Sequence, residues 1–234
     1  MRSYADIKIR LLLPFTAVIL LVFSSCTGKN RIASPTDTPT SGNIRILVDE
    51  SFRPLIDAEI MVFTGLYTNA RITPLYKPEV DVVNEFMKDS VKVMVTSRKL
   101  TDDQIKYLRD TLVVARTTTF AWDAVALVVN KSNPDSLLTY NDVKNIFTGK
   151  TTNWKDISSK SPLGQIRVIF DNPKSGNIRY FREKFDYNDP LPSNFYALNS
   201  NPEVIEFIEK NRDALGIISV NWISDPDDSL SNNF

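Results

Sequence analysis

A segment near the middle of the chain has the residue types and spacing to bind an anion through its backbone. The apolar run Ile166–Phe170 predicts a strand, and Ser175-Gly176-Asn177 and the amphipathic run Ile178–Phe185 follow it. The first turn of a helix leaves N–H groups unpaired, and a glycine lets a ligand approach the main chain. Taken alone the pattern is weak, because many strand–turn–helix corners carry Ser-Gly.

Two further strand ends carry small polar groups. They are Glu50-Ser51 and Thr96-Ser97-Arg98, and each lies at or just before a predicted helix start. In open α/β sheets, ligands bind beyond the carboxyl ends of parallel strands. Each corner alone is typical of a plain N-cap. The three together, divided between an N-terminal and a C-terminal α/β unit, are consistent with an anion held in a cleft.

The alternation of apolar segments predicts an α/β fold with mainly parallel sheets and helices on both faces. The predicted strands are Ile44–Val48, Ala70–Leu75, Val91–Val95, Phe120–Asn130, Ile166–Phe170 and Gly216–Val220. The predicted helices are Pro54–Thr64, Val80–Met87, one that opens at Thr101, Thr139–Phe147, Ile178–Phe185 and Pro202–Asn211. Residues 153–156 are expected to form a turn.

The N-terminus predicts export and a lipid anchor. Basic residues precede an apolar run, Leu11–Phe23, and the small pair Ser24-Ser25 leads to Cys26, the only cysteine. The run is too short to span a bilayer and has the layout of a secretory signal. Its end resembles a lipobox with Cys26 as the lipid-modified residue, and the alternative is an ordinary signal peptide with an incidental cysteine. We therefore expect a membrane-anchored lipoprotein on the periplasmic or cell-surface side.

The composition argues against several kinds of chemistry. The chain has no histidine, and an acylated Cys26 leaves no free thiol, so the commonest general base, metal ligand and thiol nucleophile are missing. We expect no enzyme activity, no metal site and no cofactor. Asp49, Glu50 and Asp123 could still gather as a carboxylate set, but a solvated loop explains them equally well.

Charge excludes a nucleic-acid partner. The chain has 28 Lys and Arg against 28 Asp and Glu, and residues 1–25 hold three of the basic and one of the acidic residues. The part after the signal peptide is therefore slightly acidic, which is not the balance of a nucleic-acid-binding protein. Any anion must be bound by a local site.

The most specific stretch runs from Asn130-Lys131-Ser132-Asn133-Pro134 through Leu138-Thr139 to the segment Ile146–Trp154. It resembles the signature of phosphate-binding proteins of bacterial ABC transporters, within the type 2 periplasmic binding proteins. Val95–Leu100, Ser175-Gly176 and Leu215–Ile218 are similar to further family segments. We interpret Phe147 and Trp154 as packing residues rather than ligand contacts. Asp123 is either a strand-end cap or a pocket wall.

The resemblance implies a two-lobed fold that closes around inorganic phosphate and delivers it, as a monomer, to an inner-membrane permease. The domains expected on this basis are a signal peptide (1–25), a lipidated tether (26–42), a first lobe (43–119), a second lobe (120–220) with hinges near 116–126 and 215–223, and a polar tail (221–234). The phosphate-binding residues carried over are Glu50, Ser51, Ser97, Arg98, Asp171, Ser175, Gly176 and Asn177.

The chain departs from the family pattern at the site. Asp171 stands where the family usually has arginine, four residues before Ser175, and Asn177 stands in place of threonine. One hypothesis is a charge exchange, in which Arg98 supplies the cation and Asp171 the acceptor. The alternatives are a different oxyanion, or a lipoprotein of the same fold that acts in sensing or protein interaction. The family also continues beyond the Leu215–Ile218 strand, so we expect either a fragment or a short first lobe.

Overall fold

The computed structural model describes residues 37–88 and 91–224. The predicted signal peptide, Cys26, most of the tether and residues 225–234 of the tail lie outside the described residues. The chain divides into residues 1–39 and 40–234, and the fold below belongs to the second unit. Within the described ranges, no helix has the length and apolar character needed to cross a membrane.

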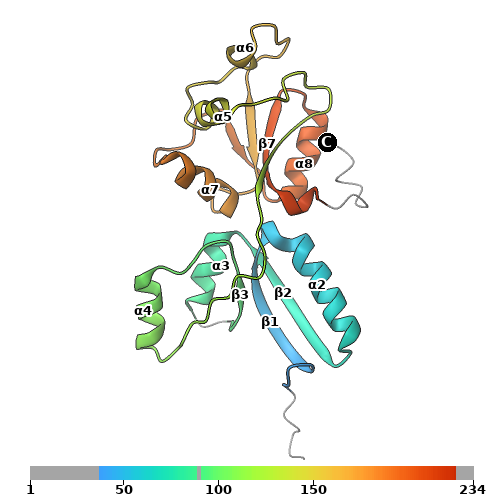
Figure 1. Cartoon of the computed structure of the whole chain (residues 1–234), viewed down its shortest axis with the longest axis vertical. Coiled ribbons are helices and arrows are strands. Elements are labelled where there is room, and N and C mark those ends of the chain that lie inside the picture. Colours follow the sequence, from blue (N-terminus) through green and yellow to red (C-terminus); the bar gives the residue numbers. More distant parts are fainter. Residues whose placement is uncertain (1–36, 89–90, 225–234) are drawn as a thin grey trace, which may run out of the picture. The chain divides into compact units, whose positions relative to one another are not determined.

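The first-sheet region, residues 42–110, contains three parallel strands in the order β2-β1-β3 (Figure 1). The strands are β1 (Gly42–Asp49), β2 (Ala70–Lys77) and β3 (Met94–Val95). The helices are α2 (Arg53–Leu66), α3 (Glu79–Phe86) and α4 (Asp102–Asp110), with a single 3-10 turn, η1 (Glu50–Phe52), between β1 and α2. Its core is small: Leu47, Val82 and Val91 are buried against partly exposed neighbours.

The second-sheet region, residues 125–223, contains four strands in the order β4-β7-β5-β6. They are β4 (Val125–Val129), β5 (Arg167–Phe170), β6 (Phe195–Ala197) and β7 (Ala214–Ser219). The pairs of β5 with β6 and β7 are parallel, and β4 runs antiparallel to β7. The helices are α5 (Tyr140–Phe147), α6 (Trp154–Ile157), α7 (Gly176–Phe185) and α8 (Asn201–Lys210), and η2 (Val220–Trp222) follows β7.

Two hydrophobic clusters hold the second-sheet region together. Phe147, Trp154 and Phe181 belong to one, and Val204, Ile205 and Ile208 of α8 belong to the other. Consecutive residues of β5 supply both, since Val168 and Phe170 join the first cluster while Ile169 joins the second. Helices therefore cover both faces of this sheet, and the predicted α/β fold with mainly parallel pairing is confirmed.

Capping residues explain where two helices begin. Thr101 and Gln104 form a reciprocal capping box at α4, and Thr139 and Asp142 form one at α5. The expected packing role of Phe147 and Trp154 is confirmed, because both are almost completely buried. The Trp154 Nε1–H also donates a hydrogen bond to the Asp213 carbonyl oxygen at 2.9 Å, which satisfies its polar atom.

The strand predicted over residues 120–130 is wrong in its first part, since residues 113–124 form no helix or strand. Strand β4 pairs with β7 from Val125 opposite Ser219, and β7 ends there, so the preceding residues have no strand to pair with. Trp122 is 94% exposed, and an apolar side chain without a packing partner gives no reason for a strand. The turn predicted at 153–156 is a short helix, α6, and β6 was not expected.

Candidate functional site

The three polar corners meet at Gly176, the first residue of α7. A Cβ atom at this position would lie 2.8 Å from Ser97 Oγ, 3.2 Å from Glu79 Oε1 and 3.3 Å from Asp49 Oδ2. The N-terminus of α7 therefore lies directly against residues at or just beyond the carboxyl ends of β1, β2 and β3. A Cβ atom at Gly176 would force at least the Ser97 hydroxyl to move, so a glycine suits this close approach. The structure thus brings together Ser97 and the Ser175-Gly176 corner, both of which the sequence identified.

The corner after β1 contains buried polar atoms without partners. Asp49 and Ser51 are 1% and 3% exposed. Asp49 Oδ1 accepts the Ser51 backbone N–H at 3.1 Å, but Asp49 Oδ2 and Ser51 Oγ have no hydrogen-bond partner among the described residues. Burial, with smaller contributions from the carboxylates of Glu79 and Asp171, raises the pKa of Asp49 to about 7. Near neutral pH its side chain can therefore accept or donate a hydrogen bond to a ligand.

A hydrogen-bonded network joins this corner to α7. The Ser175 hydroxyl donates to Asp171 Oδ1 at 2.7 Å, and the Asn177 amide donates to Asp171 Oδ2 at 3.3 Å. The Asn201 amide donates to Glu50 Oε2 at 2.7 Å and to Asp171 Oδ2 at 3.5 Å. Burial raises the pKa of both carboxyl groups, Glu50 and Asp171.

Asn201 was missed by sequence reasoning. It is fully buried at the start of α8, and its side-chain oxygen also accepts the Ser219 N–H at the end of β7. In the sequence, an asparagine at the start of an apolar helix is typical of an ordinary helix start. Only the fold shows that Asn201 bridges two carboxylates.

A second network connects the corner after β3 to α7. The Arg179 guanidinium donates to Glu79, with Nε 2.6 Å from Oε2 and Nη2 3.0 Å from Oε1. Arg179 Nη2 also donates to Ser97 Oγ at 2.8 Å, and the Ser97 hydroxyl donates to Glu79 Oε1 at 2.5 Å. Glu79 is 0% exposed. Sequence reasoning missed both charged residues, although Glu79 lies just beyond the carboxyl end of β2, where ligand-binding residues are expected.

The predicted partnership of Arg98 with Asp171 is not formed. The Arg98 side chain makes no hydrogen bond or ion pair within residues 37–88 and 91–224, and its backbone N–H donates to Thr96 Oγ1 at 3.3 Å. The guanidinium at the meeting point of the corners belongs to Arg179 instead. Contact of Arg98 with a ligand stays a prediction.

Comparison with known protein families shows to which family the chain belongs. The family described as the PBP superfamily domain matches residues 33–233. The chain belongs to the PBP superfamily. This agrees with the resemblance in the sequence, since type 2 periplasmic binding proteins share this kind of two-sheet α/β architecture.

Relatives of this PBP superfamily chain include proteins named phosphate-binding protein PstS. The one from Staphylococcus epidermidis is 28% identical over 136 residues, 57% of this chain and 41% of the relative. The one from Staphylococcus haemolyticus is 25% identical over 148 residues, 62% of this chain and 46% of the relative. The matched part thus spans less than half the length of these relatives.

Solved structures show the same fold. A putative phosphate ABC transporter substrate-binding protein with bound phosphate from Clostridium perfringens has a TM-score of 0.68 and 23% identity, over 76% of this chain and 70% of the other. An ABC-type phosphate transport receptor from Vibrio cholerae has a TM-score of 0.56 and 22% identity, over 76% of this chain and 71% of the other.

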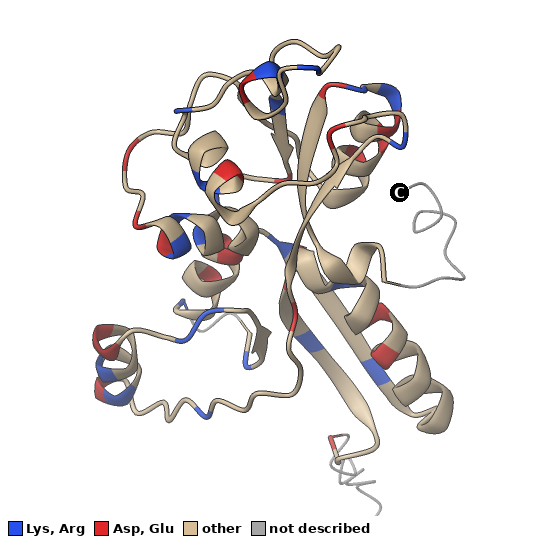
Figure 2. Ribbon diagram, turned by 45° about the horizontal axis from the view of Figure 1, so that its top comes forward, with Lys and Arg blue, Asp and Glu red and all other residues tan. Residues whose placement is uncertain are grey.

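Further contacts connect the two sheet regions of this PBP superfamily domain at its edges. Lys174 Nζ lies 2.9 Å from Asp81 Oδ1, and the Val80 N–H donates to the Lys174 carbonyl oxygen at 3.2 Å. The Asn221 amide donates to the Ser51 carbonyl oxygen at 2.7 Å. Asp123, just before β4, accepts hydrogen bonds from the side chains of Ser219 and Asn221. Basic and acidic residues are interspersed along the ribbon of both regions (Figure 2).

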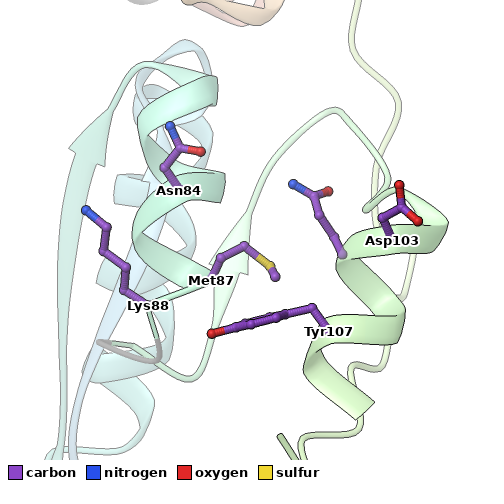
Figure 3. A pocket seen from close by; sticks show the side chains of 6 residues that line it. Asn84, Met87, Lys88, Asp103 and Tyr107 are labelled. Atoms are coloured by element: carbon purple, nitrogen blue, oxygen red, sulfur yellow. The ribbon is translucent and has the colours of Figure 1, made fainter. Parts of the chain in front are cut away.

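A separate pocket of about 540 Å³ lies between α3 and α4 (Figure 3). The Met87 and Tyr107 side chains point toward each other in it, and Asn84, Lys88, Asp103 and Gln104 complete its lining. It adjoins the C-terminal end of α3, whereas Glu79 begins that helix, so the pocket is not part of the polar corners.

Across the described residues, no group of acidic side chains has the arrangement of a metal site.

Proposed function

We propose that this chain is a solute-binding protein that holds inorganic phosphate, or a related oxyanion, where the three corners meet. The observation that carries the proposal is the convergence at Gly176, beside the buried and unpartnered Asp49 Oδ2 and Ser51 Oγ. An anion stripped of water needs several directed hydrogen bonds, and unpartnered buried polar atoms are costly unless a ligand satisfies them.

The residues at the corners have complementary roles in this proposal. The N–H groups at the start of α7 and the Ser51 hydroxyl donate to phosphate oxygens, and the Ser97 hydroxyl does so by turning away from Glu79 Oε1. Asp49 accepts a phosphate O–H, a contact that fully deprotonated sulfate cannot offer. The ligand then binds residues of both sheet regions, so binding favours the arrangement in which the regions are closed around it.

Delivery and anchoring complete the proposal. The names of the PstS relatives and of the transport receptors support delivery of the ligand to an inner-membrane ABC permease, with no covalent chemistry in the binding protein. The sequence around Cys26 supports a lipid anchor on the periplasmic or cell-surface side. We further propose that the protein works as a monomer.

A second candidate function, in sensing, protein interaction or binding of another oxyanion, is favoured by the charge of the site. Asp171 replaces the usual arginine, and the nearby Arg179 is already bound to Glu79, so the site offers an anion less positive charge than the resemblance implies. A sensing or interaction lipoprotein of the same fold, or a receptor for another oxyanion, would tolerate such a site.

Thermal unfolding of the purified full chain in mild detergent, titrated with phosphate, sulfate and a mixed set of metabolites, separates the two candidates. A ligand that binds only the folded state stabilises it by RT ln(1 + [L]/Kd), which is ~4 kcal/mol at a thousandfold excess over Kd. The phosphate receptor predicts a large rise of Tm with phosphate and none with sulfate. No shift with any anion, from a chain that unfolds cooperatively, favours the sensing or interaction lipoprotein.

The anchor is tested separately in cells. Metabolic labelling with palmitate and membrane fractionation should show acylated, membrane-bound protein, and Cys26→Ser should remove both signals. Membrane binding without acylation would contradict the anchor and leave the ligand proposal intact.

A further inference from the structure

The end of the first-sheet region that lies away from the corners exposes a group of large apolar side chains. Helix α2 ends at Leu66, and the chain enters β1 at Gly42 and β2 at Ala70, all at this end (Figure 1). We call residues 42–45 and 61–71 the distal end. The large apolar side chains exposed here are Ile44, Met61, Val62, Leu66 and Tyr67.

Three of these side chains belong to the outer face of α2. Met61, Val62 and Leu66 are each more than half exposed, and their spacing places them on one side of the helix. Ile56 and Phe63 lie on the opposite side and are buried or half-buried. A helix on the surface of a protein normally has a polar outer face, and a contiguous exposed apolar patch is typical of a protein or membrane interaction site.

The charged residues of the distal end are basic. Residues 42–48 and 60–73 contain two arginines, Arg45 and Arg71, and no Asp or Glu. Both arginines are exposed, and their side chains form no ion pair or hydrogen bond within the described part of the chain. By the register of β1 with β2, they are diagonal neighbours on the same face of the sheet. The acidic residues lie at the opposite ends of these strands, where the corners are.

An anionic lipid surface matches both features. Apolar side chains enter the boundary between headgroups and acyl chains, and nearby arginines attract anionic headgroups. The position of the tether also favours lipid, because Gly42 lies 16 residues after Cys26. A chain of that length reaches at most ~55 Å when fully extended, so an anchor at Cys26 keeps the distal end close to the bilayer at a high effective concentration.

We propose that the distal end lies on the membrane surface, with Arg45 and Arg71 on anionic headgroups and the apolar face of α2 beside them. Strand β1 has eight residues and is about 26 Å long, so the corner at its carboxyl end is held away from the lipid, where solute reaches it. This inference rests on the lipid anchor of the proposed function and adds an orientation to it. The contact is weak without the anchor, since stable membrane binding takes two signals, so Cys26→Ser still leaves the membrane fraction.

The test places the purified, acylated full chain in vesicles of phosphatidylcholine with and without phosphatidylglycerol. A photoreactive phosphatidylcholine, crosslinked by light and mapped by mass spectrometry, reports which residues touch lipid. We expect adducts in residues 61–71 in the anionic vesicles, and at least ~tenfold fewer in the double variant Arg45→Glu/Arg71→Glu, because each arginine near an anionic surface changes the contact about fivefold. High salt should weaken the contact of the unchanged chain in the same way.

Matched variants separate the distal end from the rest of the surface. Lys150→Glu/Lys160→Glu makes the same change of charge at two exposed lysines of the second-sheet region and should leave the adducts unchanged. Leu66→Ser should reduce them, whereas Leu137→Ser, at an even more exposed leucine of the second-sheet region, should not.

Two further measurements cover a loss of folding and the ligand site. If the double variant fails to unfold cooperatively, Arg45→Gln/Arg71→Gln and the salt dependence of the unchanged chain test the same contact. Phosphate affinity in calorimetry should be equal in the unchanged chain and the double variant, because neither arginine belongs to the corners.

Each outcome separates this inference from the proposed anchor. Adducts spread over both sheet regions, or unaffected by the double variant and by salt, would overturn the inference, while acylation would keep the anchor. If the chain carries no lipid but added anionic vesicles give adducts that the double variant removes, the anchor fails and the inference stands. The absence of both contradicts both. A dimer in detergent that Leu66→Ser dissociates would assign this face to a second copy and overturn the lipid contact.

Discussion

The two sheet regions differ in what holds them together. In the second-sheet region, helices pack two hydrophobic clusters onto opposite faces of the sheet, with Trp154, Phe147 and Ile205 almost completely buried. In the first-sheet region, the contiguous buried cluster contains Leu47, Val82 and Val91, and the other buried apolar side chains, Val48, Ile56, Val83 and Leu108, lie outside it. Large apolar side chains of α2, such as Met61 and Leu66, are 70% and 72% exposed.

The difference shows that apolar burial is distributed unequally between the two regions. Burial of apolar surface supplies most of the folding free energy, so the second-sheet region has far more of it. Both regions contribute buried polar residues to the corners: the first supplies Asp49, Ser51 and Glu79, and the second supplies Asp171, Ser175, Asn177 and Asn201. We expect the second-sheet region to be the more stable of the two, and ligand contacts across the corners to stabilise mainly the first.

The largest effect is expected from Trp154→Ala. This change removes a fully buried indole and its hydrogen bond to the Asp213 carbonyl, and we expect a loss of about 3–5 kcal/mol in the free energy of unfolding. Leu47→Ala in the first-sheet region should cost less, about 2 kcal/mol, because its half-buried neighbours can close the cavity more easily.

Urea unfolding of the full chain, followed by far-UV circular dichroism, measures both losses. Trp122→Ala is the control, since its side chain is 94% exposed and should change stability by less than about 0.5 kcal/mol. A larger loss from Leu47→Ala than from Trp154→Ala would reverse the comparison.

The next largest effect is a loss of phosphate affinity when the contact between the two regions at Gly176 is disturbed. Gly176→Ala puts a Cβ atom 2.8 Å from Ser97 Oγ, so the Ser97 hydroxyl must move and the contacts across the corners are disturbed. Phosphate affinity in calorimetry should fall at least ~tenfold, which is about 1.4 kcal/mol. Gly164→Ala is the matched control, because a Cβ atom there has no neighbour within 4 Å. Unchanged affinity in Gly176→Ala would place the ligand elsewhere.

The same contrast explains what could be predicted from the sequence. Strand β5, helix α7 and the starts of α4 at Thr101 and α5 at Thr139 follow from local apolar spacing and cap residues, and the second-sheet core follows from Phe147 and Trp154. Arg179 and Asn201 could not be identified, because their partners are Glu79, a hundred residues away, and Glu50, 151 residues away. Long-range polar pairs leave no periodic signal, whereas an apolar face does.

The failure over residues 120–124 has a related cause. A run that includes Phe120 and Trp122 satisfies the pattern of a strand, but strand formation requires a neighbouring strand to accept its hydrogen bonds. The partner, β7, ends at Ser219 opposite Val125. Which strand lies beside a segment depends on the topology of the sheet. The apolar pattern of a segment does not reveal where its neighbouring strand ends.

A gradual effect is expected from the pH dependence of the first-sheet corner. The pKa of Asp49 is raised from 3.8 to about 7 by burial, so the folded chain binds a proton that the unfolded chain releases. Stability from this group is complete below about pH 4 and is lost as pH rises to about 7, with a slope of up to ~1.4 kcal/mol per pH unit.

Thermal unfolding across that pH range should show the slope, and Asp49→Asn should remove this part of it. Glu50 and Asp171 also have raised pKa values, so the difference between the two proteins, rather than the slope of either, isolates Asp49. Parallel curves would show that the Asp49 carboxyl titrates normally in the folded chain.

The smallest effect is expected from removing helix caps, and it tests whether the two regions unfold as one unit. Thr101→Ala removes the N-cap hydroxyl of α4 in the first-sheet region, and Thr139→Ala removes that of α5 in the second, each at a cost of about 1 kcal/mol. If the regions unfold together, both changes lower the same calorimetric transition. If the small core of the first-sheet region lets it unfold separately, Thr101→Ala lowers only an early transition, and phosphate raises that transition. Thr101→Ser and Thr139→Ser retain the hydroxyl and should restore each transition, which assigns the loss to the cap rather than to the methyl group.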